Sequence, residues 1–319
     1  MVAHEPVPKS WPRVALLALG ACMLWSTAFV GVKYGLGFVR PLSFAGMRFL
    51  LSGPLLLPLV KGHARALAEL RRGLRTVLLV TLFQSVLLYA SFFVGMTLVS
   101  GALGAIVVGS SPLVAAVVAH FAMDNDEMTL PKAAAITGGM TGICIISLSR
   151  QPWTAAGLWE LLGVVLLLLG AVFSAVGNVL VARDRRSVHP VALSAAHFLL
   201  GGAVLLAVSL PIEGPPRLAL PWPFWGTLLW LALLSAVAFS VWFSLLTMPG
   251  AKVSELNLWK FVIPVFGALF SWLLLPEEKP ELLTVLGMLC VASSVLGYGL
   301  KVARRGSVQL ITSPPPPAG

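Results

Sequence analysis

The chain has 319 residues, of which 58% are hydrophobic and only 11% are charged, and its formal net charge is +10. Soluble domains carry about 25% charged residues, so this composition excludes an ordinary soluble domain and predicts a polytopic membrane protein. The Lys and Arg residues lie between the apolar runs, without a basic stripe interleaved with aromatic residues. We therefore interpret the positive charge as a signal of membrane topology and expect no nucleic-acid partner.

The apolar runs predict an all-α membrane protein with ten transmembrane helices, since about 20 apolar residues cross a bilayer. The basic loop from Lys61 to Arg75 predicts a surface helix. The predicted spans are 13–35, 41–60, 74–96, 98–121, 131–149, 157–182, 190–211, 222–247, 251–275 and 281–301.

The start of the chain has two interpretations. Lys9 and Arg13 precede an apolar run, and the residues from Leu19 to Cys22 resemble a lipoprotein cleavage site. The run continues to about Val32, which favours a first transmembrane helix. The three cysteines, Cys22, Cys144 and Cys290, lie in apolar runs without metal-ligand spacing, so we expect neither a disulfide nor a metal site.

The distribution of basic residues predicts that both termini are cytoplasmic, in the inner (plasma) membrane. With this orientation Arg48 and Lys260 lie within the membrane, and most of the 22 Lys and Arg residues face the cytoplasm, as the positive-inside rule requires. The basic residues left outside are Lys33, Arg40, Arg150, Arg217 and Lys279.

The two halves of the chain match each other in three places. Residues 41–53 match 190–202 without a gap, which aligns Arg48 with His197. Residues 89–97 match 239–247, and Gly139-Met140 matches Gly287-Met288. Because each half holds five spans, an odd number, the halves are expected to be inverted repeats, an arrangement found in alternating-access transporters. The predicted domains are a cytoplasmic segment 1–12, the repeats 13–149 and 150–302, and a disordered tail 303–319.

The ninth span carries the strongest site candidate. Lys260 lies roughly 15 Å into this span, near the middle of a hydrocarbon core about 30 Å thick, where a charge marks a site by default. Helical spacing places Asn257 on the same face, so both are candidate substrate ligands. Glu255 is about 140° away on a helical wheel and is either an interfacial partner of Lys252 or a proton carrier. Pro264 cannot donate to the carbonyl of Lys260, which weakens the helix there.

Other candidates come from elsewhere in the chain. Arg48 is either a substrate contact or a structural anchor. Pro112 matches Pro264 in the other half, and the two are predicted hinges. An aromatic wall is predicted around the substrate, with interfacial or packing roles as the alternative. Its members are Trp25, Tyr89, Phe92, Trp242 and Trp259.

These residues carry a resemblance to the EamA type of the drug/metabolite transporter superfamily, over residues 13 to 302. It rests on the run from Trp25 to Lys33, on Arg48-Phe49-Leu50, on Ser111-Pro112-Leu113, on Pro264 and on the acidic turns after the two prolines. The resemblance implies export or exchange of small metabolites, often amino acids. It also implies a central cavity lined by spans one to four and six to nine. The loop Asp124-Asn-Asp-Glu127 departs from the short Gly-Glu turn usual in the family.

Three functions are compatible with the sequence. The first is a secondary active transporter that exports or exchanges a small carboxylate-bearing metabolite, such as an amino acid. The second is an exchanger of phosphorylated or nucleotide-linked sugars, and the third is a membrane scaffold without transport. The chain has no Gly-rich phosphate loop, His-Glu-x-x-His or Gly-x-Ser-x-Gly motif, so we expect neither an enzyme nor a cofactor. The expected partners are a small molecule and the lipid bilayer, and a second copy of the chain is a further candidate.

Overall fold

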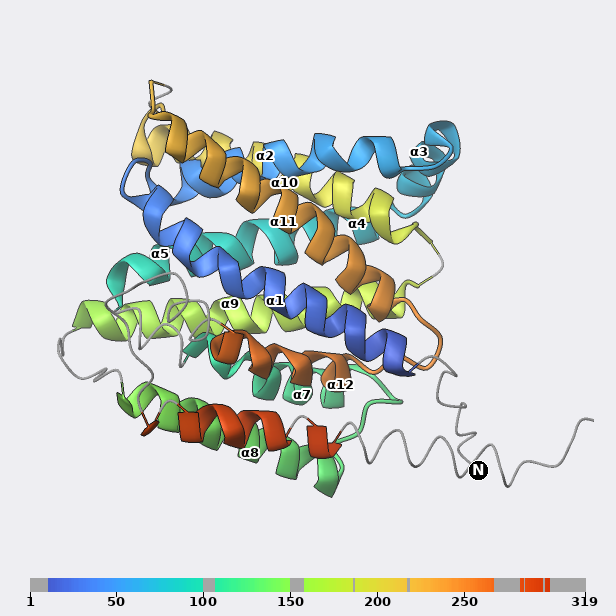
Figure 1. The fold of residues 1–319 in the computed structure, drawn as a ribbon. Helices are drawn as coiled ribbons and strands as arrows, with labels where there is room; N and C mark the ends of the chain where they lie inside the picture. Colours follow the sequence, from blue (N-terminus) through green and yellow to red (C-terminus); the bar gives the residue numbers. More distant parts are fainter. Residues whose placement is uncertain are drawn as a thin grey trace, which may run out of the picture.

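The computed structural model describes residues 11–99, 107–149, 158–185, 187–216, 219–266, 282–283, 285–294 and 296–298. Within these ranges the regular structure is helical, without a β-strand (Figure 1). The predicted tail 303–319 and nearly all of the predicted segment 1–12 lie outside the described residues.

The prediction of an all-α membrane protein is confirmed. In the described part of the chain, six helices are long and apolar enough to cross a membrane, and shorter apolar helices cover Val107–Ala122 and Val285–Tyr298. The count of ten spans stays a prediction. The six long helices are Pro12–Leu36, Pro41–Leu59, Leu74–Leu98, Leu161–Arg183, Pro190–Glu213 and Trp222–Leu246.

The elements follow the predicted spans closely, and the predicted surface helix is present as α3, most of whose side chains are exposed. Their bounds are α1 Trp11–Leu36, α2 Pro41–Leu56, η1 Leu57–Leu59, α3 His63–Arg72, α4 Leu74–Val80, the π-helix η2 Thr81–Leu87, α5 Leu88–Leu98, α7 Ser111–Ala122, α8 Leu130–Ser149, α9 Leu158–Arg183, α10 Pro190–Glu213, α11 Trp222–Leu246, α12 Val253–Leu258 and the 3₁₀ turn η3 Trp259–Phe261.

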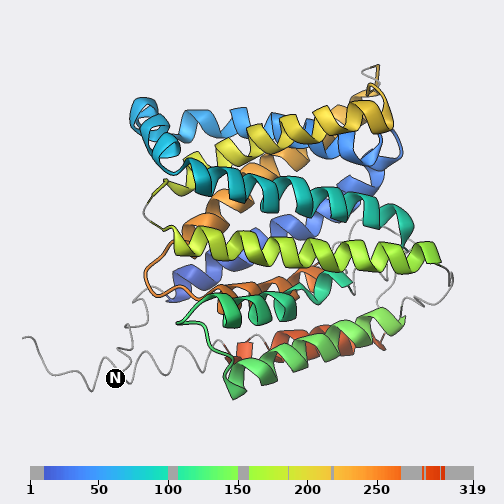
Figure 2. The same cartoon turned by 180° about the vertical axis from the view of Figure 1, so that it is seen from behind.

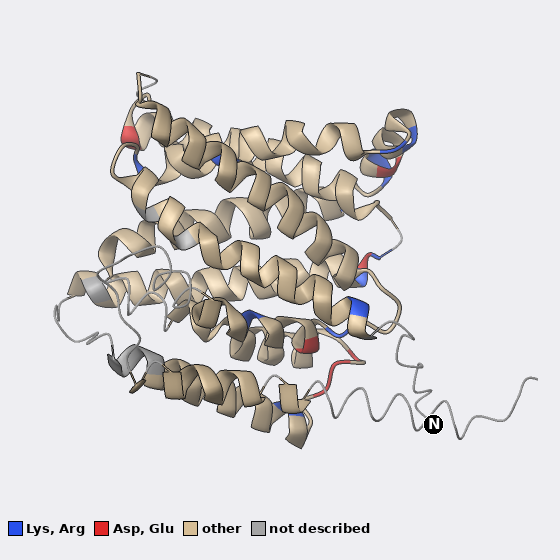
Figure 3. Cartoon of the chain, viewed as in Figure 1, with Lys and Arg blue, Asp and Glu red and all other residues tan. Residues whose placement is uncertain are grey.

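The helices lie in layers, and the main contacts join one half of the sequence to the other (Figures 1 and 2). α2 packs on α10, α1 on α11, α5 on α9, and α7 on α12. α8 lies beside the helix Val285–Tyr298, where a Cβ added to Gly142 would come within 2.6 Å of the Val291 side chain. Charged residues lie mainly near the ends of the helices (Figure 3), which leaves the apolar middle for the bilayer.

α2 begins at Pro41, a residue that suits the first helical position because its missing N–H would be unpaired there. The carboxylate of Glu213, the last residue of α10, accepts hydrogen bonds from the backbone N–H groups of Leu42 and Ser43 at 2.8 and 2.9 Å. A negative charge is also attracted to the partial positive charge of the helix dipole at a helix N-terminus. The end of α10 therefore fixes the start of α2.

α10 starts in the same way, at Pro190. Its N-cap residue, His189, donates its backbone N–H to the carboxylate of Glu69 in α3, at 3.3 Å. Arg65 hydrogen-bonds the same carboxylate at 3.0 Å, and this bond holds the pKa of Glu69 below its ordinary value. Each of the two packed helices is thus capped by a carboxylate from the other half of the chain. The end of α10 caps α2, and α3, the helix that follows α2, caps α10.

Small residues allow α2 and α10 to approach closely. A Cβ added to Gly46 would lie 3.1 Å from the carbonyl oxygen of Gly202, and one added to Gly53 would lie 3.3 Å from that of Ala195. The predicted alignment pairs Gly46 with Ala195 and Gly53 with Gly202. The two close approaches are therefore one contact repeated with the halves exchanged, as a two-fold relation would produce.

The polar contacts that α2 and α10 make with their other neighbours, α11 and η2, repeat in the same way. Arg48 donates from Nε to Ser235 Oγ at 2.8 Å, and Ser85 Oγ lies 2.7 Å from Nδ1 of His197. Extending the match of residues 89–97 with 239–247 by four residues aligns Ser85 with Ser235. Between these bonds the aligned rings of Phe49 and Phe198 stack, with centroids 5.1 Å apart and 17° between planes.

We predict that Gly202→Ala lowers the melting temperature of the purified protein. Ala is ordinarily the better helix former by about 1 kcal/mol, but here its Cβ would lie 2.6 Å from the backbone nitrogen of Leu50. Overpacking of this kind costs about 1–3 kcal/mol. Gly226→Ala in α11 is the matched control, because nothing lies within 4 Å of the added Cβ. Equal melting temperatures for the two variants would contradict the close packing of α2 on α10.

Candidate functional site

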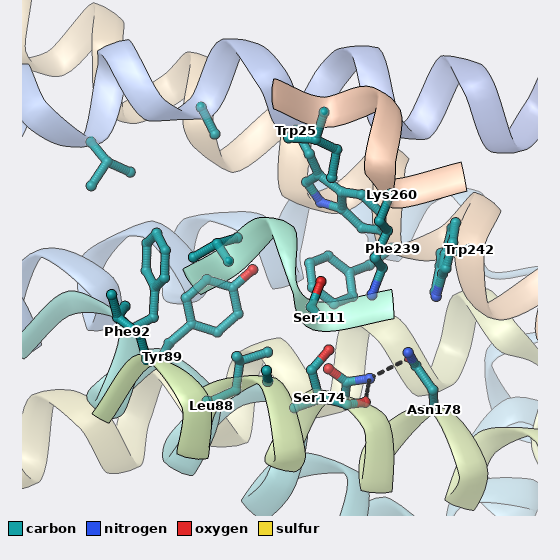
Figure 4. A pocket seen from close by; sticks show the side chains of 18 of the residues that line it. Trp25, Leu88, Tyr89, Phe92, Ser111, Ser174, Asn178, Phe239, Trp242 and Lys260 are labelled. Atoms are coloured by element: carbon teal, nitrogen blue, oxygen red, sulfur yellow. Dashed lines mark hydrogen bonds between the residues drawn. The ribbon is translucent and has the colours of Figure 1, made fainter. Parts of the chain in front are cut away.

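A cavity of about 150 Å³ lies between the two halves (Figure 4). One end is polar, where Lys260, Trp242, Ser111, Ser174 and Asn178 converge, and the other end is formed by Leu88, Tyr89 and Phe92. The full lining is Trp25, Ala28, Val32, Arg48, Gln84, Leu88, Tyr89, Phe92, Val108, Ser111, Leu167, Gly170, Ala171, Ser174, Asn178, Phe239, Trp242, Lys260 and Ile263.

Lys260 reaches the cavity from a break in the helix. α12 ends at Leu258, the 3₁₀ turn η3 follows, and helical residues resume at 262–266. Pro264 has no N–H to donate to the carbonyl of Lys260, which explains why the helix is irregular there. Ser26 of α1 donates its hydroxyl to the carbonyl of Ile263 at 3.0 Å, and so ties the broken segment to α1.

The ammonium group of Lys260 lies close to two neighbouring indole rings. Nζ lies 4.9 Å from the ring centroid of Trp242 and 5.6 Å from that of Trp25. Each such cation–π contact is worth about 0.5–2 kcal/mol. Among the described residues, no acidic side chain lies within 4 Å of Lys260. The rings therefore stabilise the charge, and none of the acidic residues in the described part of the chain pairs with it.

The same rings leave hydrogen-bonding capacity unused. The buried indole nitrogens of Trp25 and Trp242 have no hydrogen-bond partner within the described structure. Together with the ammonium group of Lys260 they form a set of donors around one end of the cavity. Such a set suits an anionic oxygen, for which charge-assisted hydrogen bonds are strong.

Arg48 lines the cavity as a buried cation, and its side chain is already engaged. Besides its bond to Ser235, its guanidinium carbon lies 5.6 Å from the ring centroids of both Phe49 and Tyr89. Arg48 is 2% exposed. Its bond to Ser235 joins α2 to α11, the anchoring arrangement that was one of its two interpretations, and its side chain also lines the cavity.

A chain of three amide side chains runs from α12 to the cavity. Asn257 accepts from Asn178 at 3.3 Å, and Asn178 accepts from Gln84 at 2.7 Å. Gln84 lies in the π-helix η2, a rare element that is often found at functional sites. Sequence reasoning weighed charged and aromatic residues and missed Gln84 and Asn178. A polar side chain inside an apolar run was the signal that could have identified them.

The acidic loop after α7 holds the start of α12 in place. Asp126 accepts from Lys132 Nζ at 2.6 Å, from the backbone N–H of Ser254 at 2.8 Å and from the hydroxyl of Ser254. Lys132 also donates to the carbonyl of Glu127 at 2.8 Å. Asp126 and Lys132 are each 1% exposed, so this is a buried and hydrogen-bonded ion pair. The loop of the first half thus positions the element that carries Lys260.

The sequence-predicted site residues fall into two groups. Lys260, Arg48, Trp25, Tyr89 and Trp242 come together in the cavity lining. The structure places the other candidates outside it, and their functional roles are untested.

Each residue outside the lining has a defined position. Asn257 is one hydrogen bond behind the lining, and Trp259 packs at the border of two apolar clusters. Glu255 lies 3.6 Å from Lys252 and accepts from the hydroxyl of Tyr298 at 3.0 Å, the interfacial arrangement that was one of its two interpretations. Pro112 is in the first turn of α7, directly after an irregular turn at Ser110, where a proline is tolerated.

Layered apolar helices with a cavity between the two halves are typical of a membrane transporter. A family model described as the EamA-like transporter family matches residues 12–148 and again 161–300, and the chain belongs to this family. The chain is therefore a membrane transporter, and its similar proteins carry transporter names, which argues against an enzyme.

The similar proteins span nearly the whole chain. An uncharacterized transporter of Synechocystis is 26% identical and covers 85% of each chain. The uncharacterized transporter YoaV of Bacillus subtilis is 23% identical over 92% of this chain and 99% of its own. A solved crystal structure has a TM-score of 0.74 at 19% identity, over 95% of this chain and 99% of that one, which shows a shared fold.

We predict that Lys132→Met destabilises the purified protein strongly. Removing one partner of a buried ion pair leaves the other charge uncompensated, at a cost of about 3–5 kcal/mol. The double variant Lys132→Met with Asp126→Asn removes both charges, so part of the loss is recovered. Lys61→Met, which removes an exposed cation, serves as the control and keeps the wild-type midpoint. Thermal or denaturant melting measures all three, and a wild-type midpoint for Lys132→Met would refute the structural role of the pair.

Proposed function

We propose that the protein transports a small carboxylate-bearing metabolite, such as an amino acid, by export or exchange. The observation that carries this proposal is the ammonium group of Lys260 in the cavity, with no acid within 4 Å among the described residues. Inserting a lysine near the middle of a bilayer costs about 3 kcal/mol on insertion scales. The two indole faces offset part of this cost, and an anionic ligand offsets more. A substrate carboxylate at Lys260 would also use the free indole N–H groups.

The transport mechanism that we propose is alternating access between two inverted repeats, 13–149 and 150–302, of five spans each. The exchanged contacts at Arg48 and His197 and at Gly46 and Gly53 support this relation, and so do the two separate matches of the family model. The cavity lies where the halves meet, which is where inverted-repeat transporters bind their substrates.

In the proposed mechanism, the contacts between the two halves at the predicted cytoplasmic ends of their helices must break for the cavity to open to the cytoplasm. Asp126 of the first half binds Ser254 of the second, and Arg183 of the second half donates to the carbonyl of Ala122 in the first. In our proposal these bonds close the cavity on the cytoplasmic side and break when the substrate enters from there. Pro112 and Pro264 lie beside irregular turns and are the proposed hinges.

A second candidate function is exchange of phosphorylated or nucleotide-linked sugars. It is favoured by one observation, that both Arg48 and Lys260 line the same cavity. Against it, the guanidinium of Arg48 is engaged with Ser235 and two aromatic rings. The cavity of about 150 Å³ is also smaller than the roughly 300–1,000 Å³ of pockets that hold drug-sized ligands.

We predict that Lys260→Met abolishes transport and binding of carboxylate substrates, while the protein still folds and inserts. Methionine keeps the apolar stem and removes the charge, and Lys260→Arg restores part of the activity because it restores a cation. A thermal-shift screen of the purified protein against a metabolite library identifies the substrate, and uptake into proteoliposomes measures transport. Lys61→Met, outside the cavity, is the matched control.

Normal carboxylate transport by Lys260→Met would overturn the proposal. A phosphorylated sugar as the only stabilising ligand would favour the second candidate. If wild-type protein in liposomes moved no compound and bound none, the protein would be a scaffold.

We propose that both termini are cytoplasmic in the inner membrane, since the basic residues predict this orientation. Reporters fused after Leu300 and after Arg150 are expected to give opposite results, cytoplasmic for the first and periplasmic for the second. Alkaline phosphatase and green fluorescent protein fusions provide complementary readouts. A periplasmic signal at the C-terminus would remove the basis for inverted halves.

A further inference from the structure

Gln84 lines the cavity and carries a buried, unpaired hydrogen-bond acceptor. The side chain is 1% exposed and comes from the π-helix η2. Its amide nitrogen donates to Asn178 Oδ1 at 2.7 Å and to the carbonyl of Ser174 at 3.3 Å, whereas Oε1 has no partner among the described residues. A buried acceptor without a partner costs about 1–3 kcal/mol, so its retention points to a ligand.

The orientation of the Gln84 amide is set from α12. Asn257 donates from Nδ2 to the carbonyl of Val253 at 2.8 Å, which leaves its Oδ1 to accept from Asn178. Because Asn178 donates from Nδ2 to Asn257, its Oδ1 faces Gln84 and accepts from Nε2 of that residue. Rotating any one of these amides by 180° would place two donors or two acceptors against each other. The chain of bonds therefore pairs the nitrogen of Gln84 and leaves its Oε1 as the atom without a partner among the described residues.

The rest of this end of the cavity has the opposite character. Lys260 and the indole nitrogens of Trp25 and Trp242 are donors, and Figure 4 shows Lys260 and Trp242 across from Asn178, the partner of Gln84. Donors and a lone acceptor at one end, with Tyr89, Phe92 and Leu88 at the other, match a molecule with an anionic group, a donor group beside it and an apolar tail.

We propose that Oε1 of Gln84 accepts a hydrogen bond from the α-amine of an amino acid whose carboxylate lies at Lys260 and whose apolar side chain lies at the aromatic end. Asn178 and Asn257 act as positioning residues that fix the Gln84 amide. The proposal rests on the proposed carboxylate function and adds the group that distinguishes an amino acid from a simple carboxylate. It gives Asn257 a role without direct substrate contact.

The test compares leucine with 4-methylpentanoate, which has the same carbon skeleton without the amine. Their dissociation constants for the purified full-length protein are measured by titration calorimetry. Wild-type protein is expected to bind leucine roughly 10–100-fold more tightly, the effect of one hydrogen bond to a charged group. Gln84→Met removes the acceptor, so the ratio falls to near one while the affinity for 4-methylpentanoate is retained.

Three further variants separate this role from a structural one. Ser85→Ala, next to Gln84 in η2 but outside the lining, keeps the wild-type ratio. Gln84→Leu also removes the acceptor, so it is expected to lose the preference for leucine, and it replaces Gln84→Met if that variant does not fold. Asn257→Leu releases the chain of amides, so the ratio falls although no atom in contact with the substrate has changed.

Each contrary result has a distinct meaning. A Gln84→Met protein with the wild-type ratio overturns the role of Gln84 and leaves the carboxylate function intact, since 4-methylpentanoate still binds. Retention of the preference in Gln84→Leu overturns the acceptor role as well. If wild-type protein binds neither compound, both the acceptor role and the proposed amino-acid function are wrong.

Discussion

The buried charge of Lys260 is the constraint on which the rest of the site depends. A cation in the apolar middle of a membrane protein requires water, aromatic faces or an anion. This chain supplies two indole rings and, among its described residues, no carboxylate within 4 Å. Lys260 lies in the 3₁₀ turn where Pro264 interrupts the helix, at a cavity between the halves. The hydrogen bonds of Asp126 to Ser254 fix the start of this segment.

The two halves pack closely through α2 and α10. Glycines bring these helices into contact, and Phe49 and Phe198 stack at their crossing. Arg48 and His197 occupy aligned positions and bond to aligned serines, yet only Arg48 lines the cavity. The two halves therefore share one packing scheme and differ at the site, where the charge distribution is asymmetric. An asymmetric site within a symmetric frame can bind one orientation of a substrate.

The features that could be predicted from the sequence are those set by the length of apolar runs and by the free-energy cost of a buried charge. Apolar length set the spans, and the cost of a buried charge identified Lys260 before its surroundings were known. The π-helix around Gln84 was not predictable, because its extra residue per turn depends on tertiary contacts. The pairing of Asp126 with Lys132 and the chain of amides also depend on partners distant in sequence. Asn257 was placed on the correct helix, but its bond to Asn178 required the fold.

The most direct test of the central claim is the water accessibility of position 260. In a variant whose native cysteines are replaced, Lys260→Cys is exposed to a membrane-impermeant methanethiosulfonate reagent from each face of sealed vesicles, with Lys61→Cys as the exposed control. The account predicts modification at position 260 from at least one face. Absence of modification from both faces, while the control reacts, would contradict a cavity that opens at Lys260.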